Sequence, residues 1–253
     1  MELTLRTFLI VCPLVFLAGF VDSIAGGGGI ISLPAYLFAG LPPHLAIGTN
    51  KLSSACGTTL TVVRFIKEKL VDLKMAIPTV LAALVGSFIG AKLSLLTDET
   101  VLKYVLLPVL VLASFIVLNK KLFGLTDEAS RPVTRRTYVI ASLAALLIGM
   151  YDGFYGPGTG SFLIIALNVF AGLSLKRSNA QTKVINLTTT LTALTVFITG
   201  GQILWLLGFT AAAFNMLGNW LGSSLSLKSG AKITRPIILV VIALLFVKVI
   251  FGI

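Results

Sequence analysis

Long apolar runs separated by short charged clusters make up most of this chain of 253 residues. The longest uncharged run covers residues 184–227. A helix needs ~20 predominantly apolar residues to cross the hydrocarbon core of a bilayer. The pattern therefore predicts an all-α fold, a polytopic transmembrane helical bundle.

The chain carries this pattern twice. Asp22 and the glycines around it recur 130 residues later, around Asp152, and Lys51 recurs 132 residues later as Lys183. Such a register predicts an internal repeat of about half the chain. We expect a first transmembrane repeat at residues 1–118, a cytoplasmic linker at 119–136 and a second repeat at 137–253.

Each half is expected to hold five elements. In the first half they are Leu3–Asp22, Gly28–Gly40, Leu45–Ile66, Met75–Leu96 and Val101–Leu118. In the second half they are Thr137–Asp152, Gly160–Gly172, Asn179–Gly200, Ile203–Leu227 and Ile233–Phe251. The second element of each half is too short to span a bilayer and follows a glycine-rich turn, so it is expected to be a glycine-broken short helix.

Composition narrows the class of protein. Hydrophobic residues make up 57% of the chain and charged residues 11%, whereas a soluble domain has about 25% charged residues. The net charge of +11 raises the question of nucleic-acid binding. The basic residues form separate clusters between apolar runs rather than one continuous face, so we expect a lipid bilayer around the chain and no nucleic-acid partner.

The basic clusters also predict a topology. An odd number of elements gives the halves opposite orientations, and the clusters at 64–74, 120–136, 176–177 and 228–235 then share one side. The positive-inside rule makes that side cytoplasmic and puts both termini outside, in a multi-pass protein of the cytoplasmic (inner) membrane. A rival topology, with a fully crossing first helix and a re-entrant second element, separates these clusters and is disfavoured. The pattern leaves open whether the first and sixth helices cross fully or stop at the midplane.

The two glycine-rich turns are the first candidate site. Helices that begin at such turns can aim N–H groups and a positive dipole end at an anion. Tight helix packing is the alternative role for these glycines. The candidate substrate-binding residues here are Gly26, Gly27, Gly28, Gly29, Gly156, Gly158 and Gly160.

Two matched pairs of charged residues lie inside the apolar runs, where ionisable groups are costly and usually functional. Asp22 and Asp152 precede the turns and are candidates for binding a coupling ion, a proton above all, or for capping the next N–H groups. Lys51 and Lys183 are candidates for holding an anion, with Lys snorkelling to the surface as the alternative. Their polar neighbours Asn50, Gln181 and Thr182 join the candidate substrate-binding set, and Ser54 and Asn186 also favour a polar lining.

Other features carry less chemistry. Asn215 and Asn219 are expected to join helices, and Gly86, Gly90, Gly218 and Gly222 form small-xxx-small motifs typical of close helix packing. Threonines in the spans, including Thr58 and Thr190, are expected to serve packing. A single histidine, His44, and two isolated cysteines argue against a catalytic triad or a metal site. We therefore expect no enzyme activity, no catalytic residue, no metal and no cofactor.

The stretch from Gly19 to Lys51, GFVDSIAGGGGIISLPAYLFAGLPPHLAIGTNK, resembles the signature of the sulfite exporter TauE/SafE family, also called the toluene sulfonate uptake permease family. The resemblance implies a bacterial or archaeal carrier for small anions such as sulfite or organosulfonates. By similarity, the family's first motif falls on Gly26, Gly28, Pro34, Gly48, Thr49 and Asn50, and its second on Gly156, Gly158 and Gly160. In the second copy Ala180-Gln181-Thr182 replaces Gly48-Thr49-Asn50, so the sequence leaves open which half contacts the ligand.

These inferences together predict a secondary transporter, an exporter by resemblance, for a small, sulfur-containing anion. The anion would lie between the turns, and one half would rock against the other to give alternating access. An anion channel of the same architecture is the alternative. The expected partners are the small anionic substrate and the bilayer. The identity of the anion, the direction of transport and the formation of a homo-oligomer stay open.

Overall fold

The structure is a computed structural model that describes residues 3–102, 104 and 132–229. All regular elements in these residues are helices. The first half contains α1 (Leu5–Ala25), α2 (Gly29–Phe38), α3 (Pro43–Lys67) and α4 (Leu73–Leu96). The second half contains α6 (Arg135–Phe154), α7 (Thr159–Ile165), the π-helical segment η1 (Ala166–Phe170), α8 (Leu175–Thr199) and α9 (Trp205–Ser229).

The expected all-α fold is confirmed for this part of the chain. Of the helices described, α1, α4 and α6 are both long enough and apolar enough to cross a membrane. The helices α3 and α8 have 25 residues each, but polar side chains such as Lys51 and Lys183 interrupt their apolar sequence. Most of the element expected at 101–118, the element expected at 233–251 and most of the linker at 119–136 lie outside the described residues.

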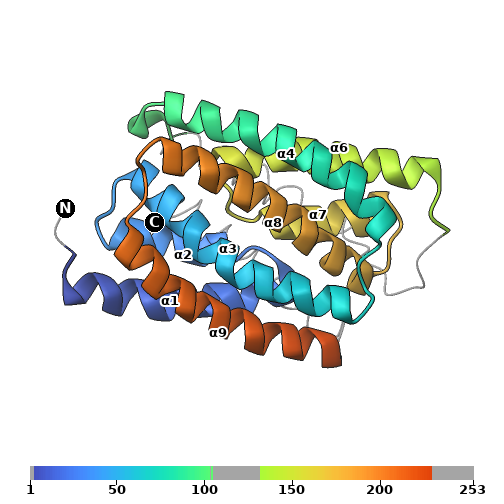
Figure 1. The fold of residues 1–253 in the computed structure, drawn as a ribbon, viewed down its shortest axis with the longest axis horizontal. Helices are drawn as coiled ribbons and strands as arrows, with labels where there is room; N and C mark the ends of the chain where they lie inside the picture. Colours follow the sequence, from blue (N-terminus) through green and yellow to red (C-terminus); the bar gives the residue numbers. More distant parts are fainter. Residues whose placement is uncertain (1–2, 103, 105–131, 230–253) are drawn as a thin grey trace.

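The helices run in two directions (Figure 1). Asn215 of α9 donates to the Val15 carbonyl of α1 at 3.3 Å, and further along α9, Gly222 packs against Phe20. Residue numbers rise together in this pair, so α1 and α9 are parallel, and α3 runs with them. In the same way Gly86 faces Leu146 and Gly90 faces Met150, so α4 and α6 are parallel, and α8 runs with them in the opposite sense to α1.

The packing partners are exchanged between the halves. The first helix of the first half, α1, packs on the last described helix of the second, α9, while α6 packs on α4. The third helices, α3 and α8, pack on each other in the middle of the bundle. Each half therefore lies against the other over most of its length.

Glycines let these helices approach closely. A Cβ atom added at Gly86, Gly90, Gly153 or Gly218 would clash with a backbone carbonyl oxygen of the facing helix. The predicted role of the small-xxx-small motifs in close helix contacts is thus confirmed. Helix association within a bilayer depends on such van der Waals packing, because lipid tails are as apolar as leucine.

Basic residues gather at one end of the bundle, here named the basic end. The helices α3 and α9 finish there, and α4, α6 and α8 begin there. This end carries Arg64, Lys67, Lys74, Arg135, Arg136, Lys176, Arg177 and Lys228. Arg64 ties two of these helix ends together, because it donates to the Trp220 carbonyl at 2.6 Å and to Ser223 Oγ at 2.8 Å.

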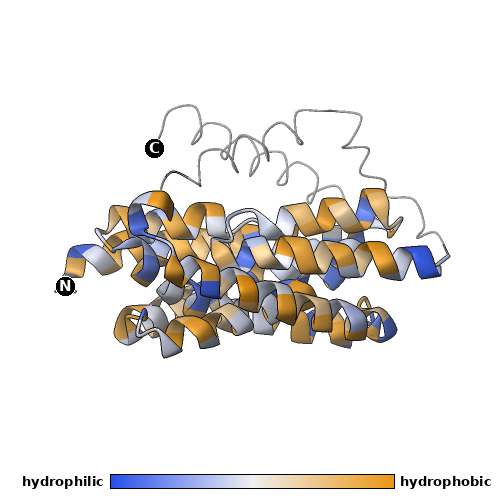
Figure 2. Cartoon of the chain, turned by 90° about the horizontal axis from the view of Figure 1, so that it is seen from above, coloured by the Kyte–Doolittle hydropathy of each residue, from blue (hydrophilic) through white to orange (hydrophobic). Residues whose placement is uncertain are grey.

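Apolar residues make up most of the helices between the two ends (Figure 2), and many of them are exposed. Leu81 and Phe88 of α4 and Leu143 and Leu147 of α6 are all more than half exposed. Monomeric soluble proteins rarely expose an apolar surface of this extent. Such a surface is suited to contact with lipid tails, as expected for a transmembrane bundle.

Candidate functional site

Glycine is required in both turns by backbone conformation. Gly26 and Gly27 have φ values of +71° and +84°, and Gly156 and Gly158 have +96° and +84°. Residues with a Cβ adopt this left-handed region at a cost of ~1–2 kcal/mol each. The turns end α1 and α6 inside the bundle and lead the chain into the short helices α2 and α7.

The two turns touch each other. A Cβ atom on Gly160 would lie 2.7 Å from the Cα atom of Gly26, and Ser161 Oγ donates to the Ala25 carbonyl at 3.1 Å. Residues more than a hundred positions apart thus meet backbone to backbone. The meeting point of the turns is therefore one of the places where the two halves are in direct backbone contact.

Two ion pairs cross between the halves beside this point. Lys51 Nζ lies 2.8 Å from Asp152 Oδ2 and donates to the Asp152 carbonyl at 2.7 Å. Lys183 Nζ lies 2.7 Å from Asp22 Oδ2 and also donates to the Asp22 carbonyl. Each lysine of one half therefore binds the aspartate of the other half. Ion pairing offsets the high cost of burying these charges.

The formal charges of these four residues cancel. The sequence predicts lysines that hold an anion, and their pairing with Asp22 and Asp152 is a contact that sequence reasoning missed. Repeat register identifies equivalent residues but carries no information on contacts between the halves. Asp22 also accepts from the Gly28 amide at 3.3 Å, so the capping role that was left open for it is present.

The ion pairs lie at different depths. Lys51 is in the half of α3 that is farther from the basic end, whereas Lys183 is in the half of α8 that is nearer to it. Asp152 and Asp22 approach from the late turns of α6 and α1, which run in opposite directions.

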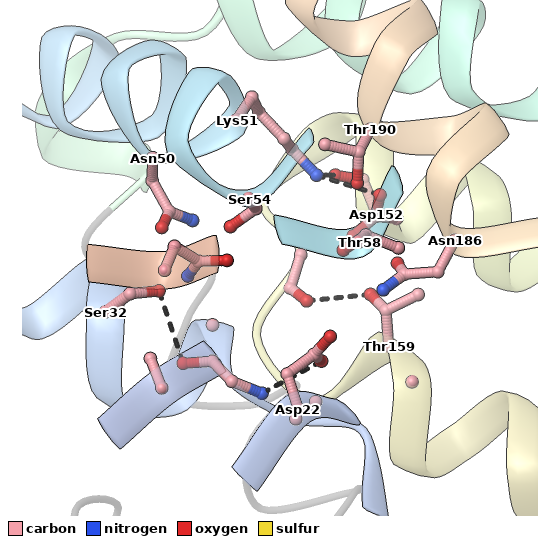
Figure 3. Close-up of a pocket in the computed structure, with 18 residues that line it drawn as sticks. Asp22, Ser32, Asn50, Lys51, Ser54, Thr58, Asp152, Thr159, Asn186 and Thr190 are labelled. Carbon is pink, nitrogen blue, oxygen red and sulfur yellow. Dashed lines mark hydrogen bonds and ion pairs between the residues drawn. The ribbon is translucent and has the colours of Figure 1, made fainter. Parts of the chain in front are cut away.

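A cavity of about 40 Å³ lies beside the turns and the Lys51–Asp152 pair (Figure 3). This volume holds about three water molecules, at ~10–15 Å³ of such volume each. In Figure 3, Asp22 lies across the cavity from Lys51 and Asp152. The lining consists of Ala18, Asp22, Gly27, Gly28, Gly29, Ser32, Asn50, Lys51, Ser54, Thr58, Asp152, Gly156, Gly158, Thr159, Gly160, Asn186, Thr190 and Asn215.

Most of the site residues expected from sequence line this cavity, and four do not. Gly26 packs against Gly160 instead, and Lys183 is buried against Asp22. The side-chain polar atoms of Gln181 and Thr182 are buried, and within the described residues they have no hydrogen-bond partner. Asn50 and Lys51 of α3 thus line the cavity, whereas the matching residues of α8, Thr182 and Lys183, do not.

Several lining residues were not in the predicted substrate-binding set, although Ser54 and Asn186 were expected to favour a polar lining beside the lysines. Ser54 and Thr58 follow Lys51 along one face of α3, and Asn186 and Thr190 occupy the matching positions of α8. Thr58 and Thr190 were expected to serve packing, but spacing of three or four residues places side chains on one helix face, so this matched spacing was a signal that could have identified them as well. Ser32 and Asn215 have no polar counterpart in the other half, and the repeat gave no such signal for them.

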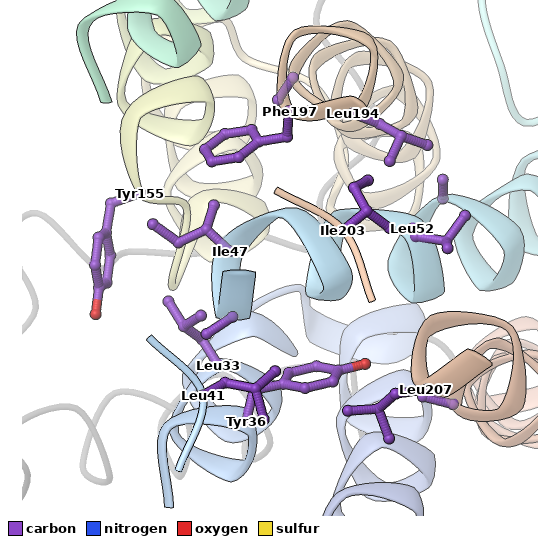
Figure 4. Close-up of a cluster of buried hydrophobic side chains, with 14 of the residues drawn as sticks. Leu33, Tyr36, Leu41, Ile47, Leu52, Tyr155, Leu194, Phe197, Ile203 and Leu207 are labelled. Atoms are coloured by element: carbon purple, nitrogen blue, oxygen red, sulfur yellow. The ribbon is translucent and has the colours of Figure 1, made fainter. Parts of the chain in front are cut away.

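An apolar cluster fixes the elements around the cavity (Figure 4). Leu33 of α2 and Leu52 of α3 belong to this cluster and directly follow the lining residues Ser32 and Lys51. Phe197 of α8 joins them. Close packing of these side chains leaves α2 and α3 little freedom to rotate, which positions the polar residues that face the cavity.

Comparison with known proteins gives one consistent family. The chain matches the family described as sulfite exporter TauE/SafE over residues 11–249. It is 37% identical to the probable membrane transporter protein ORF9 of a Sinorhizobium species, over 94% of this chain and 89% of the relative. It is also 37% identical to the probable membrane transporter protein YfcA of Escherichia coli K12, over 93% of this chain and 87% of the relative.

A probable membrane transporter protein of Haemophilus influenzae is 35% identical over 94% of this chain and 92% of the relative. No solved structure gives a significant match. The family match covers nearly the whole chain and agrees with the resemblance carried by the stretch from Gly19 to Lys51. This chain is a member of the sulfite exporter TauE/SafE family, a membrane transporter of that type.

Proposed function

We propose that this transporter moves a small, sulfur-containing anion, sulfite or an organosulfonate, across the cytoplasmic membrane by alternating access. The observation that carries the proposal is the small polar cavity between the glycine turns, where Lys51 meets Asp152. The candidate binding groups are the turn backbones, Asn50 and Lys51, with Lys183 in support. Asp22 and Asp152 are the candidate carriers of a coupling proton.

The chemistry of the lining supports a small oxyanion. Hydroxyl and amide groups of Ser54, Thr58, Asn186 and Thr190 can donate to sulfite oxygens. A cavity of about 40 Å³ is too small for a bulky ligand, so a larger organosulfonate requires the site to widen. Lys51 supplies the charge-assisted contact that an anion needs within a bilayer.

We also propose that the protein consists of two inverted five-element repeats. Support comes from the opposite directions of α1 and α6 (Figure 1) and from the exchanged packing partners of α4 and α9. The crossed ion pairs follow the same exchange. Repeats of this kind place a site at their interface near the bilayer midplane, and rocking of one repeat against the other opens it to either side.

The proposed orientation puts the basic end in the cytoplasm. Short loops that are rich in lysine and arginine stay on the cytoplasmic side of bacterial membranes. The basic end carries residues from five helix termini, including Lys67 and Lys176. The N-terminus of α1 lies at the other end of the bundle (Figure 1), on the outer side in this proposal.

Sulfite flux in proteoliposomes tests the proposal. We expect Lys51→Ala to lower the rate of sulfite transport at least tenfold, because it removes the cation that faces the cavity. The control is Lys92→Ala, since Lys92 is exposed on α4 and lies outside the cavity lining. Equal rates in wild type and Lys51→Ala would contradict the proposed site.

An anion channel is the second candidate, because a channel shares a polar path between helices. The relatives are named as transporters, which favours a carrier. Recordings from a planar bilayer separate the two, because a channel passes ions far faster than a carrier turns over. Discrete conductance steps in sulfite solution would overturn the carrier proposal.

A further inference from the structure

We infer that the two crossed ion pairs have different roles, and that Lys51–Asp152 is the pair that substrate opens. On this inference, which rests on the proposed function, the incoming anion takes the place of the Asp152 carboxylate at Lys51. Asp152 Oδ2 then binds one proton from water on the open side of the site. The Lys183–Asp22 pair stays closed and holds the halves together.

Position distinguishes the two pairs. Both Lys51 and Asp152 line the cavity, so an anion within it reaches the Lys51 ammonium group directly. The side chain of Lys183 is 0% exposed, and Lys183 is not part of the lining. An anion in the cavity meets Asp22 in front of Lys183, and the like charge repels it.

The partners of the two carboxylates also differ. Asp22 is held by Lys183 and by the Gly28 amide. The Oδ2 atom of Asp152 is buried, and within the described residues its contact is the ion pair to Lys51, with no further hydrogen-bond donor. Exchange at Asp152 therefore breaks one contact of the carboxylate and leaves the capped turn beside Asp22 intact.

The third observation is the side-chain amide of Asn50, which lies next to Lys51 in the chain and has an oxygen that is unpartnered in the described part of the chain. Asn50 lines the cavity, is 7% exposed, and its Oδ1 atom has no hydrogen-bond partner within the described residues. A buried polar atom without a partner is costly. A half-turn of the amide would present its N–H groups to an oxyanion bound at Lys51.

Charge balance explains why Asp152 takes up a proton when the anion binds. Before exchange, Lys51 and Asp152 sum to zero. After exchange, Lys51 pairs with the anion, and Asp152 is left buried without a cation, a state that is costly for a charged carboxylate. The binding of one negative charge and one proton leaves the net charge of the site unchanged, so little charge must cross the low-dielectric interior.

The surroundings of Asp152 contain few other titratable groups. Lys51 faces it from α3 and Asp22 faces it across the cavity from α1, while Tyr151 and Tyr155 are near in the chain. Around this site α4, α7 and α8 contribute Ser87, Thr159, Asn186 and Thr190. Within the described residues, Asp152 is thus the group best placed to take the proton when Lys51 changes partner.

Calorimetry of sulfite binding to the purified full chain tests the exchange. Titrations at mildly acidic pH, where free sulfite is the singly charged bisulfite ion, in two buffers of different ionisation enthalpy give the number of protons that the protein takes up. We expect wild type to take up one proton per sulfite, with a Kd that rises about tenfold for each pH unit. This pH dependence needs wild-type protein alone, so it decides the question even where a variant does not fold.

The matched variants locate the proton. We expect Asp152→Asn to bind sulfite with no proton uptake and with a Kd that no longer follows pH. We expect Asp22→Asn to be less stable, because Lys183 loses its partner, but still to take up one proton per sulfite. Binding without proton uptake in wild type, or uptake that persists in Asp152→Asn, overturns the exchange and leaves the proposed function standing. Absence of sulfite binding in wild type contradicts sulfite as the substrate and the exchange with it.

Discussion

At the scale of single residues, two ion pairs join the halves, one between Lys51 and Asp152 and one between Lys183 and Asp22. The repeat paired Lys51 with Lys183 and Asp22 with Asp152 as equivalents, and the structure joins each lysine to the aspartate of the opposite half. A sequence register carries no signal for a contact between residues so far apart in the chain. The sequence could not predict the direction of the α8 side chains either, because tertiary packing sets the rotation of α8 that turns Gln181 away from the cavity.

The Lys183–Asp22 pair, which is inferred to hold the halves together, gives a stability prediction. Lys183→Met leaves Asp22, which is 14% exposed, without its cation, and removal of one partner of a buried pair costs at most ~3–5 kcal/mol. We expect a lower thermal midpoint for Lys183→Met in detergent, and a partial recovery in the double variant Lys183→Met/Asp22→Asn, which removes the uncompensated charge. A double variant no more stable than Lys183→Met would argue against a paired role.

The contact between the turns gives a second prediction at this scale. Gly26→Ala places a Cβ against the backbone of Gly160, in addition to the strain of its positive φ. Gly201→Ala is the matched control, because Gly201 has a φ of +68° but open space around its Cβ position. We expect Gly201→Ala to cost ~1–2 kcal/mol and Gly26→Ala to cost clearly more, measured by thermal unfolding. Equal losses would mean that the turns do not press on each other.

At the scale of elements, the sequence predicted the broken helices better than their ends. The short element expected at Gly28–Gly40 is α2, Gly29–Phe38. Its counterpart, expected at Gly160–Gly172, is divided into α7, Thr159–Ile165, and the wider turn of η1, Ala166–Phe170. Nothing in local composition distinguishes a π-helical turn from an α-helical one, so the sequence could not foresee it.

Close packing of α4 on α6 gives the prediction for elements. Gly90→Ala puts a methyl group against the Met150 carbonyl oxygen, whereas the Cβ position of Gly149 lies 3.1 Å from a Thr189 methyl group that can shift slightly. Overpacking typically costs ~1–3 kcal/mol. We expect a clear fall in thermal midpoint for Gly90→Ala and a small one for Gly149→Ala. A reversed order would contradict the packing described for these helices.

At the scale of the whole molecule, length, apolar composition and repeat register were enough to predict a helical membrane protein with two similar halves. The orientation of each half could be inferred from the basic clusters, because lysine and arginine in the loops at the membrane surface set the topology. This signal does not depend on how the side chains pack in the core. In the structure Lys67 and Lys176 lie at the same end of the bundle, although they come from different halves. The proposed alternating access depends on this arrangement, because an interfacial site needs two oppositely oriented halves that both cross the membrane.

Accessibility of single cysteines in intact cells tests that arrangement most directly. In a background with Cys12 and Cys56 replaced by serine, Lys67→Cys and Lys176→Cys are compared with Arg6→Cys and Lys92→Cys by labelling with a membrane-impermeant thiol reagent. We predict that Arg6→Cys and Lys92→Cys are labelled from outside, and that Lys67→Cys and Lys176→Cys are labelled only after the membrane is opened. Labelling of Lys67→Cys and Lys176→Cys from opposite sides would contradict the inverted halves and the site proposed between them.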